Sequence, residues 1–423
     1  MIGSGIFLVP GAVLNQVHGY VPLALLAWVA GGLLSMLGAL TYGELSAANP
    51  KAGGLYVYIR DCFGTFPAFL FGWALFFAIV GGAIATLAVG FSNTLGQVVP
   101  MPPIAAKVIA IGMLAVVTAV NVRGTRQSAD LQNWTTAIKV GAIVLMSVVL
   151  LWLGHGFTQA SASVSPAMKT ETTLASGFGL AMLGVLWAYE GWQYATFSAG
   201  ETINPQRNFP RAFLIGVAAL IGIYLLANLA YLRALGPQEM ARSKSAAAAS
   251  LAAVVGPKTA TLIALAIAIS IFSAINGIIL TAPRVYYAMA EDGLFFQKLA
   301  VVHPRFQTPA VAVIAGSVWA AVLAATGTFE QLFTYTVFTG WLFYGLAAAS
   351  IFIYRRKWPD RPRPYSVPGY PWTPLLFILA AAALVLNTIV AQPRTAGIGL
   401  GIVFLGAPAY LIWRSRKRVP TPP

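Results

Sequence analysis

The sequence contains little charge and almost no cysteine. Only 9% of its 423 residues are charged, whereas a soluble domain carries roughly a quarter. The single cysteine, Cys62, has no second cysteine in this sequence to pair with, so we expect no internal disulfide. The three histidines, His18, His155 and His303, all fall between the apolar runs. This distribution argues against a histidine-based catalytic or metal site inside the apolar segments, and we expect neither a metal nor a cofactor.

Long apolar runs dominate the sequence instead. Hydrophobic residues make up 58% of the chain, and their recurrence in long runs is typical of a polytopic membrane protein. Breaks at charges, prolines and polar clusters leave one short run, about 6–17, and eleven that are long enough to span a bilayer. The long runs are approximately 21–48, 66–98, 104–121, 133–154, 175–200, 211–234, 258–289, 309–328, 331–354, 371–392 and 396–413. We therefore predict an all-α membrane protein with twelve transmembrane segments, the first of them truncated.

The formal net charge of +15 predicts the orientation of these segments. Basic residues are enriched in the cytoplasmic loops of membrane proteins. Most of the 26 lysines and arginines fall on the side that holds "RRKWPDRPR", residues 355–363. We predict that this side is cytoplasmic. Twelve segments then place both termini inside the cell, and no nucleic-acid partner is needed to explain the charge.

Two apolar segments contain helix-breaking residues. One break is Gly3-Ser4-Gly5, and the other is "LWAYEGW", residues 186–192. Broken backbone at membrane depth is tolerated only where it is buried in protein or lines a water-filled cavity. Free amides at the start of a half-helix suit a carboxylate, and free carbonyls at the end of one suit an ammonium. Two such breaks predict a site for a zwitterion, although a hinge or tight packing would also explain the glycines.

The positions of the two breaks predict an internal repeat. They fall at the start of the first segment and in the middle of the sixth, as expected for two five-helix units of opposite topology. The first repeat is then 1–154 and the second 175–356, with two additional helices in 371–414. Together these parts form a single transmembrane domain, 1–423.

Five sequence motifs carry a family resemblance. They are "GSGIFLVPGAVL", "PKAGGLYVYIRDCFG", "WAYEGW", "AGETINPQRNFPRA" and "LTAPRVYYAMAEDG". Together, across almost the whole chain, they resemble the amino acid–polyamine–organocation (APC) superfamily, and most of all its L-type amino-acid transporter branch. The resemblance implies a LeuT-type 5+5 inverted repeat. It also implies secondary active transport of L-amino acids across the plasma membrane by alternating access, and no enzyme activity. Sodium-independent exchange is the first expectation, and proton-coupled symport, uniport and a non-transporting amino-acid sensor remain open.

The resemblance also implies roles for individual residues. The substrate carboxylate would meet the amides of Gly3, Ser4 and Gly5. The substrate ammonium would meet backbone carbonyls at the two breaks, namely those of Ile2, Trp187, Ala188 and Glu190. Trp187 would close over the substrate as a gate. Trp341 would lie near the side-chain pocket, and Tyr224 would contact the unwound region.

Lys139 lies within an apolar segment, where a charge is costly and usually faces a polar interior. The alternative from spacing alone is that it reaches the membrane surface. The resemblance implies that its ammonium occupies the place of a sodium ion in sodium-coupled relatives. It would tie the first helix to the eighth, near Ser270 and Ser273. Transport would then be sodium-independent, with proton coupling through this lysine still possible.

Other polar residues have less specific readings. Glu190 fits a substrate ligand, a proton carrier, or a carboxylate satisfied by backbone donors of the following half-helix, and we favour the last. Glu44 is expected to be structural. Glu201, Asn204 and Arg207 suggest a conformational latch or a helix cap, and Asn204 directly before Pro205 favours the cap.

The expected partners are an amino-acid substrate and the lipid bilayer. Some animal relatives are linked to a glycoprotein subunit through a cysteine in the loop after the third helix. The loop here, "GQVVPMPP" at 96–103, has no cysteine, so no disulfide-linked accessory subunit is expected. We expect a bacterial cytoplasmic membrane as the location. A chain starting at Met1 would place a charged amino group near the middle of the membrane, so we also expect Met1 to be an internal residue of a longer natural protein.

Overall fold

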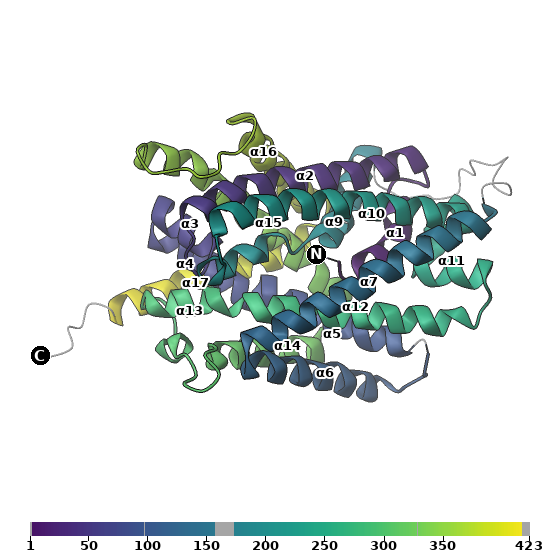
Figure 1. The fold of residues 1–423 in the computed structure, drawn as a ribbon, viewed down its shortest axis with the longest axis horizontal. Helices are drawn as coiled ribbons and strands as arrows, with labels where there is room; N and C mark the ends of the chain where they lie inside the picture. The colour runs from purple at the N-terminus through teal and green to yellow at the C-terminus, as the bar shows by residue number, and fades with distance from the viewer. Residues whose placement is uncertain (1, 97, 157–172, 328, 417–423) are drawn as a thin grey trace, which may run out of the picture.

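The computed structural model describes residues 2–96, 98–156, 173–327 and 329–416 (Figure 1). This part of the chain is helical and contains no strand. Its helices are α1 (Gly5–Gln16), α2 (Val21–Ala48), α3 (Leu55–Phe63), α4 (Thr65–Ala74), η1 (Leu75–Ile79), α5 (Val80–Gly96), α6 (Pro103–Arg123), α7 (Thr125–Leu153), α9 (Leu174–Tyr189), η2 (Gln193–Glu201), α10 (Pro205–Arg242), α11 (Ala246–Val254), α12 (Thr259–Thr281), α13 (Pro283–Glu291), η3 (Gln297–Ala300), α14 (Ala310–Thr326), α15 (Phe329–Lys357), α16 (Trp372–Ala391) and α17 (Pro393–Arg416). Met1, and with it the expectation about the natural start, lies outside the described residues.

Nine helical spans within these ranges are long and apolar enough to cross a membrane. They are Val21–Ala48, Thr65–Gly96, Pro103–Arg123, Thr125–Leu153, Pro205–Arg242, Thr261–Glu291, Thr336–Lys357, Trp372–Ala391 and Pro393–Arg414. Each overlaps one of the long runs predicted from the sequence. The remaining predicted runs correspond to α1, α14 and the interrupted pair of α9 and η2. The prediction of an all-α, multi-pass membrane protein is confirmed.

The predicted interruption in the sixth segment falls at residues 190–192. Helix α9 ends at Tyr189, and the 3-10 helix η2 begins at Gln193. Glu190 leaves the helix with ψ of 150°. Gly191 then has a φ of 117°, in the left-handed region that residues with a Cβ rarely adopt. This glycine allows the chain to leave the helical path inside the membrane-spanning bundle.

The first helix also begins inside the bundle. Helix α1 starts at Gly5 and lies among the other helices, packed on α9 and α10 (Figure 1). Ser4 is its N-cap residue, but the Ser4 side chain makes no capping hydrogen bond. The first amides of a helix have no acceptor within the helix. Both interruptions therefore place helix ends, with their backbone polar groups, in the interior of the protein.

Helices from the first part of the chain pack on helices from the second part. Helix α1 packs on α9, α2 on α10, α5 on α12, and α6 on α14. Figure 1 shows α2 and α10 running side by side along one face, and α6 and α14 along the opposite face. The span Thr65–Gly96 lies in the centre, since 78% of its most apolar stretch is buried. A helix that is hydrophobic on all sides is suited to this position.

The apolar pattern did not predict three local features. Helices α3 and α11 are nine residues long and fall between the long apolar runs. They are too short to span a bilayer, so a search for apolar spans passes over them. The third is a π-helical turn, η1, which interrupts the third span at Leu75–Ile79.

Candidate functional site

A cavity of about 230 Å³ lies between the two helix interruptions. Residues 3–5 line it from the first break, and Trp187, Glu190 and Gly191 line it from the second. The rest of its wall comes from α5, α7, η2 and α12. Two unwound segments that are far apart in the sequence thus face the same space.

Lys139 on α7 is 3% exposed and joins the first interruption to α12. Its Nζ donates to the carbonyl oxygen of Ile2 at 2.7 Å and to Ser273 Oγ at 3.0 Å. Ser270, almost one turn earlier on α12, donates to the carbonyl oxygen of Gly3 at 3.1 Å. The alternative in which Lys139 reaches the membrane surface is therefore wrong, because its ammonium is held by buried oxygens.

Ala188 is the contact point between the two broken helices. A Cβ added to Gly5 would lie 2.6 Å from Ala188 Cα, so only glycine permits this approach of α1 to α9. A Cβ added to Gly3 would meet only Ala274 Cβ, at an ordinary 3.4 Å. The Tyr224 hydroxyl donates to the Ala188 carbonyl at 2.6 Å. Tight packing therefore explains the glycine at position 5, whereas the backbone at Gly3 is open to the cavity.

Ser4 has an unused hydroxyl next to the cavity. The residue is 1% exposed, lines the cavity, and its Oγ has no hydrogen-bond partner among the described residues. Its carbonyl accepts the amides of Phe7 and Leu8, each at 3.1 Å. A buried hydroxyl without a partner is costly. Ser4 therefore offers a hydrogen-bond donor beside the first amides of α1.

Glu190 is held by side chains and not by the backbone. Its Oε1 accepts hydrogen bonds from the Tyr344 hydroxyl at 2.7 Å, from Gln193 Nε2 at 3.0 Å and from the Tyr194 hydroxyl at 3.1 Å. The Gly191 amide donates to Gln193 Oε1 instead. The prediction that backbone donors of the following half-helix satisfy Glu190 is therefore wrong, because the first such donor, the Gly191 amide, is bound by the Gln193 side chain. Glu190 Oε2 is buried and has no partner among the described residues.

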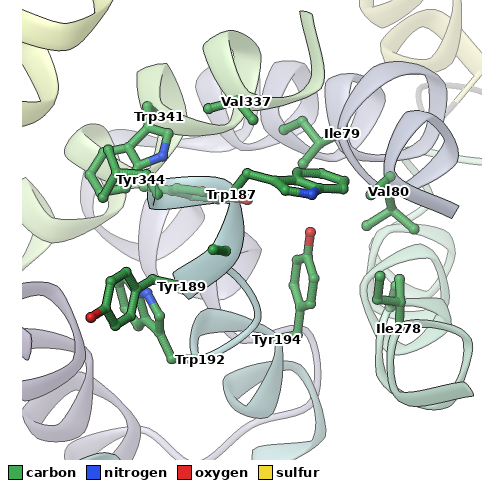
Figure 2. Packing of buried hydrophobic residues seen from close by; sticks show 14 of the residues in the cluster. Ile79, Val80, Trp187, Tyr189, Trp192, Tyr194, Ile278, Val337, Trp341 and Tyr344 are labelled. Carbon is green, nitrogen blue, oxygen red and sulfur yellow. The ribbon is translucent and has the colours of Figure 1, made fainter. Parts of the chain in front are cut away.

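Trp187 forms one side of the cavity. Figure 2 shows its indole reaching from the end of α9 toward Ile79 and Val80, with the Tyr194 hydroxyl directed toward the same space. The residue is 7% exposed and lines the cavity. Its carbonyl accepts the Glu190 amide at 3.2 Å. The indole therefore lies between the second interruption and the span Thr65–Gly96.

Trp341, expected near the side-chain pocket, is not among the described residues that line this cavity. Its ring packs on Phe377 and Tyr344, with centroid separations of 5.4 and 6.0 Å. The residue that α15 sends toward the second interruption is Tyr344, three positions further on. Residues three apart lie on neighbouring positions of a helix face, so Trp341 supports the tyrosine that holds Glu190.

The sequence analysis missed three polar residues of the site. Gln132 and Tyr194 line the cavity, and Tyr344 binds Glu190. Helical spacing contained a signal for Gln132 and Tyr344, but not for Tyr194, which lies beyond the break at 190–192. Gln132 precedes Lys139 by seven positions on α7, which places both on one helix face. Tyr344 lies three positions after Trp341 on α15, which places these two on neighbouring positions of one face.

Two bidentate arginine–glutamate ion pairs connect elements at the predicted cytoplasmic side of the described structure. Arg355 binds Glu44 with Nε and Nη2, at 2.8 and 2.7 Å. Arg284 binds Glu201 in the same bidentate way, at 2.8 and 3.0 Å. Asn204 is the N-cap residue of α10, directly before Pro205 as predicted, and its carbonyl accepts the amides of Arg207 and Asn208; its φ is 47°, and its side chain makes no capping bond. Of Glu201, Asn204 and Arg207, Glu201 is the one whose side chain forms an ion pair with another element among the described residues.

An all-helical membrane scaffold in which one broken helix and one helix that starts inside the bundle line a shared cavity is typical of a secondary transporter. Residues 1–407 match the family model described as amino acid permease. The chain belongs to this family, within the APC superfamily and near its L-type branch.

Three relatives illustrate the similarity. The chain is 33% identical over 425 residues to the serine/threonine exchanger SteT of Bacillus subtilis, covering 99% of this chain and 94% of the relative. It is 32% identical over 431 residues to the human large neutral amino acids transporter small subunit 2, covering 99% and 79%. It is 31% identical over 426 residues to the human cystine/glutamate transporter, covering 99% and 84%. The chain is thus an amino-acid transporter of the membrane and not an enzyme.

Proposed function

We propose that the chain exchanges L-amino acids across the plasma membrane without sodium, by alternating access. The observation that carries the proposal is the cavity between the two interruptions, with a buried lysine ammonium tied to the first of them. The serine/threonine exchange in the name of the Bacillus subtilis relative supports exchange as the mode of transport.

The substrate carboxylate binds at the start of α1. The amides of Gly3, Ser4 and Gly5 lie at a helix N-terminus, where the helix dipole favours an anion. The unpartnered Ser4 hydroxyl adds a side-chain donor at the same place. In this arrangement, substrate binding satisfies a buried hydroxyl that is otherwise without a partner.

The substrate ammonium binds at oxygens from both interruptions. The carbonyls of Ile2 and Ala188 already accept one protein hydrogen bond each, from Lys139 and Tyr224. A carbonyl oxygen has two lone pairs and can accept a second donor. Glu190 Oε2 faces the same region without a partner. We assign the ammonium to these oxygens, with Trp187 closing over the bound substrate.

Lys139 replaces a coupling cation in this mechanism. Its ammonium already links the carbonyl of Ile2 to Ser273 on α12. A sodium ion at this position would need the same oxygens and would meet a like charge. Transport is therefore independent of sodium.

Alternating access uses the helices of the two repeats. The moving bundle consists of α1, α2, the α9–η2 pair and α10, which rock against the remaining helices. Glu44 on the moving side pairs with Arg355 on α15, and Glu201 pairs with Arg284 on α13. These ion pairs hold the bundle to the scaffold on one side of the membrane and act as a latch.

We place the protein in a bacterial cytoplasmic membrane with both termini inside the cell, in line with its basic loops. We also propose that it works without a disulfide-linked subunit, since Cys62, its one cysteine, is half-buried and packed on α15.

Transport in proteoliposomes tests the proposed function. A thermal-shift screen of the twenty amino acids first identifies ligands, because a ligand that binds the folded state raises its melting temperature. Vesicles preloaded with such an amino acid are then expected to take up the labelled one faster than empty vesicles, equally in sodium and in choline buffer. Absence of trans-acceleration would refute exchange, sodium dependence would refute the role of Lys139, and binding without any flux would favour a sensor.

Two substitutions of Glu190 distinguish the roles of its two carboxylate oxygens. In Glu190→Ala, the three side-chain donors on Oε1 lose their acceptor, at a cost of roughly 1–3 kcal/mol for each buried group left unsatisfied. Glu190→Gln retains an amide oxygen for them. We expect a clear loss of thermal stability for the alanine variant and near-native stability with weakened substrate binding for the glutamine variant. Equal melting temperatures for the two variants would contradict the observed network.

A further inference from the structure

A groove of about 640 Å³ lies outside the transport site, between α2, α10 and the segment before α16. Leu40 of α2 forms one wall, and Tyr365 and two prolines of the segment before α16 form another. Helix α10 contributes Arg207 and Arg211 together with Leu214. The groove is therefore mainly apolar, with two positive charges.

The charged and apolar parts of the groove are separated along α10. Arg207, Arg211 and Leu214 follow a spacing of four and three residues, so they lie on one face of the helix. Leu214 is about 10 Å further along the axis than Arg207, at ~1.5 Å per residue. It is 51% exposed, and Leu40 lies beside it in the groove wall. The groove thus has a basic end near the start of α10 and an apolar end deeper in the membrane.

The two arginines have no anionic partner within the described residues. Both are exposed, and neither side chain makes a hydrogen bond or an ion pair there. The carboxylate next to this region, Glu44, is already occupied by Arg355 and by the amide of Val367 at 2.6 Å. The positive charge of the groove is therefore available to an external anion.

Tyr365 adds a neutral hydrogen-bonding group to the wall. Its ring lies over Gly43, where an added Cβ would be 3.3 Å from the ring, and its hydroxyl is buried without a partner among the described residues. Burial, with a smaller effect of Glu44, raises the pKa of Tyr365 to about 12. The hydroxyl therefore remains protonated at neutral pH and can donate a hydrogen bond.

We propose that this groove binds one anionic phospholipid of the cytoplasmic leaflet. The phosphate lies against Arg207 and Arg211, and an acyl chain follows the apolar wall past Leu214 and Leu40. Basic pockets between transmembrane helices on the cytoplasmic side are suited to anionic headgroups, and an arginine guanidinium matches a phosphate in bidentate geometry. A free phosphate would use the basic end but would leave the apolar end uncovered.

The position of the groove links the lipid to the moving helices. Helices α2 and α10 both belong to the bundle that we propose to rock, whereas residues 364–368 lead into α16 on the other side of the groove. A lipid bound here contacts both parts at once. Its occupancy is therefore expected to change the stability of the protein and the rate of exchange.

The test uses the purified full chain and native mass spectrometry with phosphatidylglycerol and phosphatidylcholine. The double variant Arg207→Gln/Arg211→Gln is expected to bind phosphatidylglycerol roughly 30-fold more weakly, the factor for about 1 kcal/mol per arginine. Its affinity for phosphatidylcholine should not change. The matched control is Arg123→Gln/Arg126→Gln, which removes two exposed arginines from the same predicted side, away from the groove, and should bind phosphatidylglycerol like the wild type.

Each other result overturns the proposal. Wild-type affinity in the groove variant would show that the groove is not the site, and equal losses in both double variants would show general attraction to a basic surface. Competition by glycerol phosphate as strong as by the lipid would assign the site to a free phosphate. If the glutamine variant does not fold, Arg207→Lys/Arg211→Lys can replace it, since this variant retains the charge but not the bidentate geometry. Undiminished binding by the lysine variant, together with unchanged binding by Leu214→Asp, would refute the lipid site.

Discussion

Lys139→Met is expected to reduce amino-acid uptake at least tenfold in proteoliposomes. Methionine has a similar length but cannot donate hydrogen bonds. The carbonyl of Ile2 then loses its 2.7 Å ammonium donor, and Ser273 Oγ loses the one at 3.0 Å. A hydrogen bond to a charged group contributes roughly 1.5–3 kcal/mol, so the link between the first interruption and α12 is largely lost. Initial uptake rates of a labelled substrate measure the effect.

Lys107→Met is the matched control for this variant. Lys107 is exposed on α6, and no contact of its side chain with the transport cavity is present in the described structure. Its variant should transport like the wild type. Wild-type uptake by Lys139→Met would show that the buried ammonium does not organise the substrate site.

Gly5→Val is expected to abolish substrate binding and to lower the melting temperature. A Cβ at this position would lie 2.6 Å from Ala188 Cα and 2.7 Å from Ala188 Cβ, so α1 must move away from α9. Overpacking of this kind costs typically 1–3 kcal/mol. The shift also separates the two sets of backbone groups that we assign to the substrate. Thermal-shift titration with an identified substrate measures both effects.

Gly222→Val on α10 controls for the same change of residue type. A Cβ at Gly222 meets no atom within 4 Å, so this variant should bind substrate normally. If Gly5→Val bound substrate with unchanged affinity, the contact between α1 and α9 could not be part of the site.

The interruption of the sixth span was predictable from the sequence because the signal is local. Glycine after an acidic residue inside an apolar run is unfavourable for a continuous helix in a membrane, and Gly191 indeed adopts a backbone angle that other residues avoid. Lys139 was identified for a similar reason, since an isolated charge in an apolar segment needs a polar partner.

The partners of Glu190 could not be predicted in the same way. The backbone donors of η2 were the nearest candidates in the sequence, but Tyr344 comes from 154 positions away and meets the carboxylate only because α15 packs against α9. Tyr344 could not be identified from the sequence for the same reason. Which of two residues on one helix reaches a site depends on the rotation of that helix, and this rotation is set by packing.

The sequence by itself determined that the chain is a multi-pass helical membrane protein whose sixth span is broken. Hydrophobic runs, glycines and isolated charges each reflect whether their own segment lies in lipid. They can therefore be interpreted without knowing how the segments pack. Only the tertiary structure decided that Gly5 serves close packing while Ser4 keeps a free hydroxyl in the cavity, and that Arg207 and Arg211 share a groove with Leu40. These features depend on distances between segments that are remote in sequence. Such distances are set by side-chain packing and cannot be inferred from composition.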